Sequence, residues 1–248
     1  NQHGSTLALF LLHNEDEENR IYPQLLNRGT LDGVLFITNS TEDPFVQRLL
    51  NSGMPFVTIG RDCEETPANF VDVENVEGAY TAVSHLIRLG YEKIATITGP
   101  LVSLAAQNRL DGYRQALVSR GHSLDANLIM EGDFTEAGGY FAMQQLLAHE
   151  PEAVFVASDA MALGALRAVR DVDWSVPDDI ALISFDDLPQ AALSNPPLTT
   201  IRQPIKRLGM LAVETLLDVI ANGVTPTRRI LLPTELVIRS SCGADSFG

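Results

Sequence analysis

The sequence predicts an α/β fold whose parallel sheets are covered by helices on both faces. Short apolar runs of strand length recur along the chain, and most of them are separated by segments with helical periodicity. This alternation is typical of parallel sheets, because the crossover between two parallel strands usually contains a helix. The chain has 248 residues, of which 45% are apolar and 20% charged, so it can bury a core in one or two domains.

The predicted strands are apolar runs rich in residues that favour extended structure. No run approaches the length of about 18 uninterrupted apolar residues that a membrane-spanning helix needs, so we expect no membrane partner. The runs lie at 6–12, 33–38, 55–59, 70–73, 93–98, 153–157 and 180–184.

The predicted helices have apolar residues three and four positions apart, which places those residues on one face. In the segment 75–90, Asn75 is placed to cap the first turn and Gly90 to end the helix. Further helices are expected at 17–27, 43–51, 106–120, 136–149, 160–170 and 205–221.

Three short crossings are expected between two domains, because the sequence contains no repeat, low-complexity tract or long charged linker. Gly99 and Pro100 follow a predicted strand. An extended stretch ends at Pro204, and Pro233 interrupts the last extended run. We therefore expect two interleaved lobes, each with a doubly wound parallel sheet, joined by three crossing strands.

The charge balance and the cysteines exclude several classes of function. The chain has 17 basic and 32 acidic residues, a net charge of −15, which opposes nonspecific binding to a phosphate backbone or an anionic membrane. Cys63 and Cys242 are far apart and belong to no CxxC or Cys/His cluster, so neither a zinc site nor a redox pair is predicted. We expect no metal and no cofactor, and two reduced thiols are typical of a cytoplasmic protein.

The common catalytic motifs are absent from the sequence. It has no phosphate-binding loop, no GxGxxG, no GxSxG nucleophile elbow and no HExxH. The five histidines lack ligand-like spacing, and acidic pairs such as 178–179 and 186–187 more often cap helices or face solvent. We therefore expect no enzymatic activity. The alternative, an enzyme with Asp186 or Glu77 as its base, would require turnover of a bound small molecule.

Polar and aromatic side chains follow several of the predicted strands. Glu77 lies just inside a helix, Arg109 at the start of another, and Phe134 after a short strand. Ser158 follows the strand AVFVA, and Asp186 follows the strand ALISF. In open α/β sheets, ligands bind beyond the carboxyl ends of the strands. Guanidinium and carboxylate groups bind hydroxyls, and an aromatic face stacks on a sugar ring, so this set suits a small polyol.

Eight segments of the sequence, in order, resemble the lactose/galactose-repressor family of bacterial transcription regulators in its effector-binding region. The resemblance covers nearly the whole chain. The segments are LDGVLF (31–36), VENVEGAYTAVSHLIRLGYEKIATITGP (73–100), NRLDGYRQAL (108–117), EGDFTEAGGY (131–140), AVFVASDAMALGALRAVR (153–170), VPDDIALISFDDLP (176–189), PPLTTIRQP (196–204) and LLPTELVIRSS (231–241).

The resemblance implies a type I periplasmic-binding-protein-like fold, with an effector in the cleft between two lobes and a homodimer formed along one side. The N-terminal lobe is then expected at 1–99 with 204–232, and the C-terminal lobe at 100–203 with 233–248. The family's hinge falls at Gly99, Pro100, Pro204 and Pro233.

The resemblance also implies a set of site residues. Carried over position by position, the effector contacts fall at Arg109, Phe134, Asp186 and Gln203, with Glu77 lining the cleft and Ser158 where many members have Asn. This serine removes an amide donor, so the identity of the ligand does not follow from sugar-binding relatives. These positions also have structural interpretations. Arg109 would be a solvated helix arginine and Phe134 a core or lobe-surface aromatic. Asp186 and Ser158 would cap helices, and Gln203 would support crossing-strand backbone.

The resemblance further predicts a longer natural protein. Family members place a basic helix-turn-helix, a hinge segment and the first strand and helix of the effector domain before the equivalent of Gly4. A sheet without its first strand would leave two inner edges unpaired. We therefore expect operator DNA to be bound only through an N-terminal domain that precedes this sequence.

The function predicted from the sequence is the effector-sensing and dimerising part of a cytoplasmic transcriptional regulator, a repressor of a catabolic operon. A sugar, a sugar phosphate and a nucleobase stay open as the effector, in falling order. The alternative is a secreted sugar-binding protein of a transporter, which shares the fold and the cleft. An upstream basic helix-turn-helix or an upstream secretion signal would decide between them, and the ending LLPTELVIRSS already favours the regulator.

Overall fold

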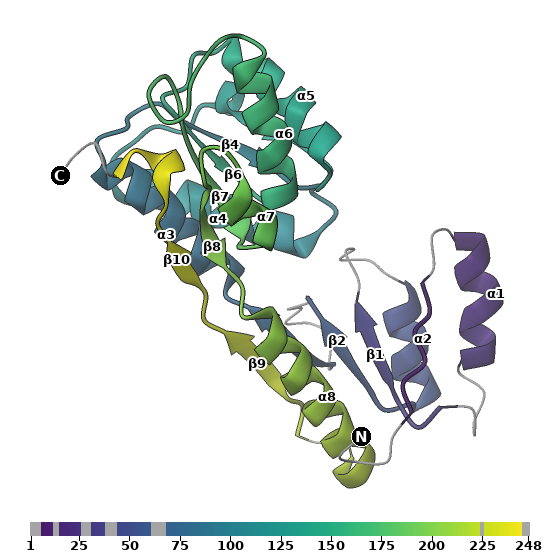
Figure 1. Cartoon of the computed structure of the whole chain (residues 1–248). Coiled ribbons are helices and arrows are strands. Elements are labelled where there is room, and N and C mark those ends of the chain that lie inside the picture. The colour runs from purple at the N-terminus through teal and green to yellow at the C-terminus, as the bar shows by residue number, and fades with distance from the viewer. Residues whose placement is uncertain are drawn as a thin grey trace.

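The computed structural model describes residues 6–11, 15–25, 31–37, 44–60, 68–223 and 226–244. These residues form two sheets, each with its own helices, which we call the first lobe and the second lobe (Figure 1). No helix in the described part of the chain combines the length and the apolarity needed to cross a bilayer.

The first lobe is built on a four-stranded parallel sheet in the order β1-β2-β3-β9. Neighbouring residues of β2 point to opposite faces, as the pleat requires. Phe56 packs with Phe45 and Leu49 on one face, and Val57 packs with Ala212 on the other. Helices α1 and α2 therefore cover one face and α8 the other. The elements are α1 (Glu15–Leu25), β1 (Val34–Ile37), α2 (Pro44–Ser52), β2 (Phe56–Ile59), β3 (Asn69–Val73), α8 (Ile205–Asn222) and β9 (Arg229–Leu232).

The second lobe is built on a six-stranded sheet in the order β10-β8-β7-β6-β4-β5, parallel except for the edge strand β10. Its strands are β4 (Ile94–Thr98), β5 (Ile129–Glu131), β6 (Ala153–Val156), β7 (Ala181–Asp186), β8 (Thr199–Arg202) and β10 (Glu235–Val237). Its helices are α3 (Asn75–Arg88), α4 (Leu104–Ser119), α5 (Glu136–Leu147), α6 (Asp159–Arg170) and α7 (Pro189–Leu193), with short 3-10 turns at Ala126–Leu128 and Ser240–Cys242.

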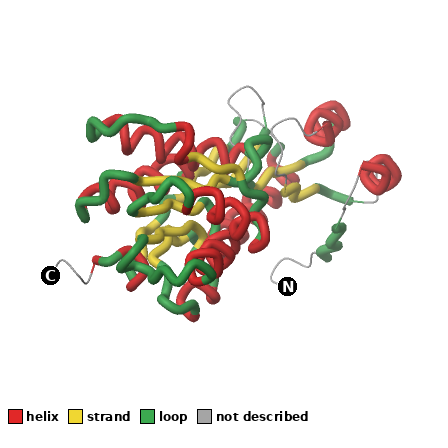
Figure 2. The backbone as a smooth tube through the Cα atoms, turned by 90° about the horizontal axis from the view of Figure 1, so that it is seen from above, coloured by secondary structure: helices red, strands yellow, loops and turns green. Residues whose placement is uncertain are grey.

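The core of the second lobe lies in two layers, one on each face of the sheet. Phe155 packs with α3 and α4, whereas Val154 and Val156 pack with α5 and α6. Seen from above, the strands lie between these helices (Figure 2). Each fully buried apolar side chain of this kind contributes about 1.5 to 3 kcal/mol, so the second lobe has a substantial core of its own.

All the predicted helices are confirmed within the described residues, with small shifts in their bounds; positions 26–27 and 43 of two of them lie outside the described residues. One local expectation for α3 was wrong. Asn75 does not cap the helix: the cap position is Glu74, and the Asn75 side chain turns to other partners described below. Gly90 follows the helix with a φ of 94°, a conformation that glycine adopts without strain.

The strand predicted at 6–12 is not formed. Residues 6–11 have no regular structure, and Leu7 and Leu9 are 84% and 78% exposed, while Leu12 lies outside the described residues. A strand needs a neighbour for its backbone groups. Among the described strands, β1 is the edge of its sheet and pairs with β2 alone, so no ladder reaches this run.

The first passage between the lobes was expected at Gly99 and Pro100, and the structure places it earlier. Strand β4 pairs with β5 and β6 of the second lobe, and α3 packs against α4 on that sheet. The chain therefore changes sheets at Glu74, whose N–H donates to the Leu232 carbonyl. The reason is that helical periodicity predicts an apolar face without specifying which sheet that face covers. The other two changes of sheet occur between β8 and α8 and between β9 and β10.

Candidate functional site

A buried arginine is the centre of the candidate site. Arg109 on α4 is 6% exposed. Its Nε donates to Asn75 Oδ1 at 2.9 Å, and its Nη1 donates to the Ala157 carbonyl at 2.6 Å and to Asp186 Oδ1 at 3.5 Å. The guanidinium also stacks on the Phe185 ring, 3.8 Å from the centroid. A buried cation is thus held by a carboxylate, two further oxygens and an aromatic face, as burial of a charge requires.

The fold explains why these groups meet. Ala157 and Asp186 stand at the carboxyl ends of the neighbouring parallel strands β6 and β7. Asn75 opens α3, and α3 packs closely on α4 because Gly112 leaves no Cβ to collide with the Val76 carbonyl. The polar groups therefore lie together at the carboxyl ends of the strands, where ligands bind in open α/β folds.

Asp186 accepts from two side chains at one oxygen. Gln203 Nε2 donates to Oδ1 at 2.6 Å, and Arg109 Nη1 donates to the same oxygen at 3.5 Å. Burial raises the pKa of Asp186 above its ordinary value, and Arg109 and Gln203 offset this only in part. The carboxylate is therefore a strong acceptor whose protonation begins at a higher pH than for an exposed aspartate.

The cluster keeps hydrogen-bonding capacity for a ligand. No acceptor in the described part of the chain is recorded for Nη2 of Arg109. The Asp186 carboxylate is half-buried, so it keeps access to solvent. Because donors and an acceptor stand side by side, the arrangement can bind a hydroxyl group as both acceptor and donor.

Three residues near the carboxyl ends of the second lobe's strands have strained backbone conformations. Phe134, Asp186 and Asp187 have φ angles of 63°, 125° and 60°. Positive φ is costly for residues other than glycine and persists where the surroundings hold it, often at binding sites. Phe134 lies directly over Gly99, at the end of β4, and also packs against the core of the second lobe. The aromatic thus lies at the end of β4 and the carboxylate at the end of β7, with β6 between them in the same sheet.

Two of the expected residues have other surroundings. The Ser158 hydroxyl accepts from the Met161 N–H at 3.3 Å and caps α6, which is its structural interpretation. Glu77 is exposed on the first turn of α3. Successive helical residues are rotated by about 100°, so Glu77 points nearly opposite to Asn75 and away from Arg109. The structure brings Arg109, Asp186 and Gln203 together and leaves Glu77 apart.

Three site residues escaped sequence reasoning. Asn75 was interpreted as a helix cap, whereas its side chain accepts from Arg109 and donates to the Val73 carbonyl at 3.2 Å. Asp159 was not singled out from the sequence, and Asp187 was considered only as part of the acidic pair 186–187. Asp159 is fully buried. The spacing of these residues along the chain carries no signal for such contacts, because their partners come from distant strands.

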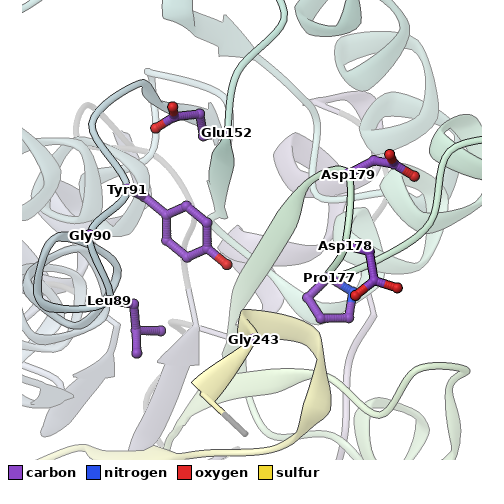
Figure 3. A pocket seen from close by; sticks show the side chains of 8 residues that line it. All are labelled: Leu89, Gly90, Tyr91, Glu152, Pro177, Asp178, Asp179 and Gly243. Carbon is purple, nitrogen blue, oxygen red and sulfur yellow. The ribbon is translucent and has the colours of Figure 1, made fainter. Parts of the chain in front are cut away.

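Two cavities lie near the second lobe's sheet. One, of about 510 Å³, lies at the amino ends of strands β4, β6 and β7, opposite to the Arg109 cluster. Its wall contains Tyr91, Glu152 and Asp178 (Figure 3). The other, of about 480 Å³, is lined by Asp187, Gln203 and the first residues of α8. The second cavity therefore adjoins the Arg109 cluster through Gln203. The segments 38–43 and 61–67, which follow β1 and β2, lie outside the described residues.

No group of three or more His, Cys, Asp or Glu side chains suited to a metal ion occurs within the described ranges.

Comparison with known proteins gives a consistent result. Residues 83–242 match the model of a periplasmic binding protein-like domain. The chain is 39% identical over 215 residues to the HTH-type transcriptional regulator CelR of Thermobifida fusca, covering 85% of this chain and 63% of that protein. It is 36% identical over 252 residues to the HTH-type transcriptional repressor PurR of Klebsiella pneumoniae, covering 99% of this chain and 73% of that one.

Solved structures give the same picture. A complex of the transcriptional regulator CelR with cellobiose has a TM-score of 0.88 at 38% identity, covering 92% of this chain and 71% of that one. A regulatory protein of the LacI family from Chloroflexus aggregans has a TM-score of 0.85 at 32% identity, covering 92% and 83% of the two chains. The chain thus spans less than two thirds of CelR and about three quarters of PurR.

Proposed function

Because the chain belongs to the LacI family of transcriptional regulators, we propose that it is the effector-sensing part of such a regulator and that its effector is a neutral sugar. The proposal includes a homodimer in the cytoplasm and operator binding through an N-terminal helix-turn-helix domain, so that ligand binding in the cleft controls a repressor. The chain itself would do no chemistry.

The observation that carries the proposal is the pairing of Arg109 with Asp186 and Gln203. The cation and the carboxylate compensate each other, so the cluster has no excess charge to bind an anion. A phosphate or carboxylate beside Asp186 would be repelled, whereas a hydroxyl can donate to Asp186 and accept from Arg109. This favours a neutral sugar over a sugar phosphate. The relative with a TM-score of 0.88, bound to cellobiose, supports the same class of ligand.

The mechanism follows from the position of the cluster. Asp186 and Gln203 stand next to the passage from β8 to α8, where the chain leaves the second lobe for the first. A ligand that binds these groups and the facing lobe favours one angle between the lobes, and it shifts the equilibrium by its difference in affinity for the two states. Couplings of this kind are typically about 1 to 3 kcal/mol, enough to change operator affinity severalfold or more.

Two other functions are less well supported. A secreted sugar-binding protein would share the fold, but the relatives at 36% to 39% identity are transcriptional regulators. An enzyme with Asp186 as its base would need that carboxylate free for a substrate proton. Asp186 is instead engaged by Arg109 and Gln203, and the same relatives are regulators.

The proposal is tested by a thermal-shift screen of this chain against cellobiose, ribose, glucose 6-phosphate and hypoxanthine. A ligand present at about 100 times its Kd stabilises the native state by about 2.7 kcal/mol, which raises Tm measurably. We expect a neutral sugar to raise Tm, and the phosphate and the nucleobase to leave it unchanged. Stabilisation by the sugar phosphate or the nucleobase alone would contradict the assignment to neutral sugars.

A further inference from the structure

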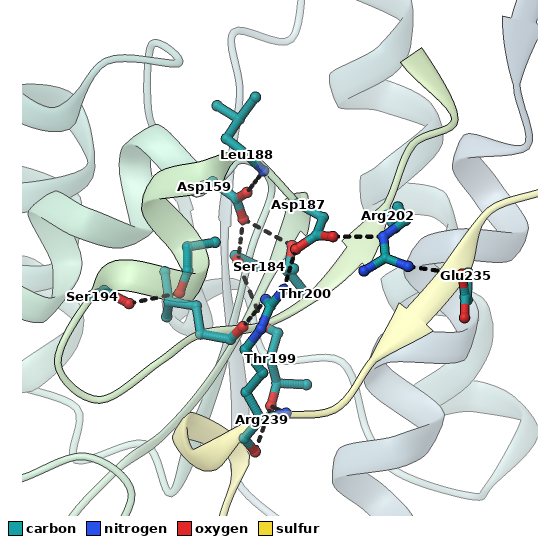
Figure 4. A network of polar contacts seen from close by, with 12 residues as sticks. Asp159, Ser184, Asp187, Leu188, Ser194, Thr199, Thr200, Arg202, Glu235 and Arg239 are labelled. Carbon is teal, nitrogen blue, oxygen red and sulfur yellow. Dashed lines mark hydrogen bonds and ion pairs between the residues drawn. The ribbon is translucent and has the colours of Figure 1, made fainter. Parts of the chain in front are cut away.

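The segment that carries Asp186 is held from one side by a pair of arginines (Figure 4). Asp187 is 9% exposed at its side chain. Its Oδ2 accepts from Arg202 Nε at 2.6 Å, and its Oδ1 accepts from Arg239 Nη2 at 2.5 Å. Each carboxylate oxygen thus has its own cation, which gives charge-assisted bonds with a defined direction.

The same segment is held from the other side by Asp159. Its Oδ2 accepts from the Leu188 N–H at 2.6 Å, and its Oδ1 accepts from the hydroxyls of Ser184 at 2.5 Å and Thr200 at 2.8 Å. Asp159 is completely buried at the start of α6, so this anchor is part of the lobe's core. Both residues that follow Asp186 are therefore fixed, one by its side chain and one by its backbone.

The arginines connect this anchor to the passages between the lobes. Arg202 is the last residue of β8, and its Nη1 donates to Glu235 Oε2 at 3.3 Å, at the start of β10. Arg239 is fixed by a 2.6 Å bond from Nη1 to the Leu198 carbonyl and by a 2.8 Å bond from its own N–H to the Thr199 hydroxyl. Asp187 thus ties the ligand-binding segment to two of the strands that lead to the first lobe.

Strain explains why such an anchor is needed. Asp186 and Asp187 are consecutive residues with positive φ, and an unrestrained chain would relax from this conformation. Burial alone would raise the pKa of Asp187, but the hydrogen bonds and charges of Arg239 and Arg202 lower it below its ordinary value. The anchor is therefore charged at neutral pH.

We propose that Asp187 and Asp159 are positioning residues: they hold the strained segment 186–188 so that the Asp186 carboxylate faces Arg109 and the ligand. This inference rests on the proposed function, because it assigns a role in binding the effector. The nearby carboxylate of Asp187 does not contact the ligand in this account. It acts through the backbone of Asp186, with Arg202 and Arg239 as its partners.

The test is Asp187→Asn. Asparagine tolerates positive φ, so this variant removes the charge without adding backbone strain. Hydrogen exchange of segment 186–188 without ligand and the Kd for cellobiose, measured by calorimetry, are the two readouts. We expect faster exchange in this segment and an affinity at least about tenfold weaker, since small misplacements of a binding group are costly.

The matched control is Asp179→Asn. The Asp179 carboxylate also accepts two local hydrogen bonds, from the Ser175 N–H at 2.8 Å and the Ser175 hydroxyl at 2.7 Å. Asp179 precedes β7, so it lies at the amino end of that strand, away from Asp186. We expect this variant to leave the exchange of segment 186–188 and the cellobiose Kd unchanged. A loss of affinity as large as in Asp187→Asn would overturn the inference.

Two further variants separate positioning from loss of folding. Asp187→Gly relieves the strain that Asp187→Ala keeps, so glycine should retain more affinity than alanine. Arg202→Gln removes the bond from the more exposed arginine and leaves the bond from Arg239, so it should weaken cellobiose binding less than Asp187→Asn does. This variant provides the comparison even if Asp187→Asn does not fold. Unchanged exchange in a folded Asp187→Asn, or weaker binding without faster exchange, would overturn the proposal. If the parent chain does not bind cellobiose, the proposed ligand fails while the exchange comparison still decides whether the anchor holds the segment.

Discussion

At the scale of single residues, the sequence could identify the charged groups but not all their partners. Arg109 was predicted from its place at a helix start, Asp186 from its place after a strand, and both from the family resemblance; the structure brings them within 3.5 Å. Asn75 and Asp159 make contacts that depend on how α3 and α6 seat on the sheet. Gln203 was expected to support crossing-strand backbone or to bind the effector, and its side chain bonds to Asp186. The sequence pattern therefore does not predict the direction in which each side chain points.

Replacing Arg109 tests the energetic role of this group. Arg109→Ala removes one partner of a buried pair and leaves Asp186 without its cation, which we expect to lower the free energy of unfolding by about 3 kcal/mol. The control is Arg114→Ala on the same helix, whose pair with Asp111 is exposed and should contribute under about 0.5 kcal/mol. Urea denaturation of both variants provides the comparison. Equal stability of the two variants would contradict a stabilising role for the buried Arg109–Asp186 pair.

The pH dependence of sugar binding follows from the raised pKa of Asp186. A ligand hydroxyl that donates to this carboxylate needs it ionised, so affinity should fall as the pH is lowered through the raised pKa, at a higher pH than for an ordinary aspartate. For the unliganded protein the sign is opposite. The folded state takes up the proton first, so this group's contribution to stability falls as pH rises between the unfolded and folded pKa values. Calorimetric titrations from neutral to acidic pH measure the binding effect, and an affinity that stays constant until ordinary aspartates protonate would refute it.

At the scale of elements, helical periodicity located the helices but not the sheet that each one covers, and one predicted strand is not formed. The segment 75–88 forms the expected helix, yet it covers the second lobe's sheet and not the sheet that contains β3. The apolar run at 6–11 has strand composition but no neighbouring strand in the described sheet. A helix satisfies its own backbone groups, whereas a strand depends on partners that are distant in sequence.

The close packing of α3 on α4 can be tested with a pair of glycines. A Cβ at Gly112 would collide with the Val76 carbonyl and with Ala79, so Gly112→Ala should destabilise the protein by about 1 to 3 kcal/mol. Gly209 is also helical but has nothing within 4 Å of its added Cβ. Gly209→Ala should therefore stabilise by about 0.5 to 1 kcal/mol, because alanine has the higher helix propensity. Thermal unfolding of both variants decides, and the same sign for both would contradict the described packing.

At the scale of the whole molecule, the two lobes share the chain through three passages. The fold class was expected from alternating strands and helices and the interleaved lobes from three short crossings, and the structure and the family match show both. The first passage was misplaced, because Gly99 and Pro100 form a turn within the second lobe and not a change of sheet. Turn residues mark where a chain bends, and they do not specify which sheet follows.

A change in lobe angle is the expected response of the whole molecule to its ligand. Small-angle X-ray scattering of the chain with and without cellobiose should show a smaller radius of gyration at saturation, because a sugar held by both lobes favours the closed state. Mannitol at the same concentration is a control for solvent contrast. Scattering that is unchanged while the sugar is bound would remove lobe closure from the mechanism.

Calorimetric titration of cellobiose into the wild-type chain and into Asp186→Asn shows whether the Arg109 cluster binds a neutral sugar. The substitution keeps the shape of the side chain and removes the charged acceptor. We therefore expect the free energy of cellobiose binding to weaken by about 2 kcal/mol, roughly a thirtyfold increase in Kd. Folding of the variant is checked by its thermal unfolding. Binding of cellobiose with the same Kd by a folded Asp186→Asn would show that the sugar lies elsewhere and not at the Arg109 cluster.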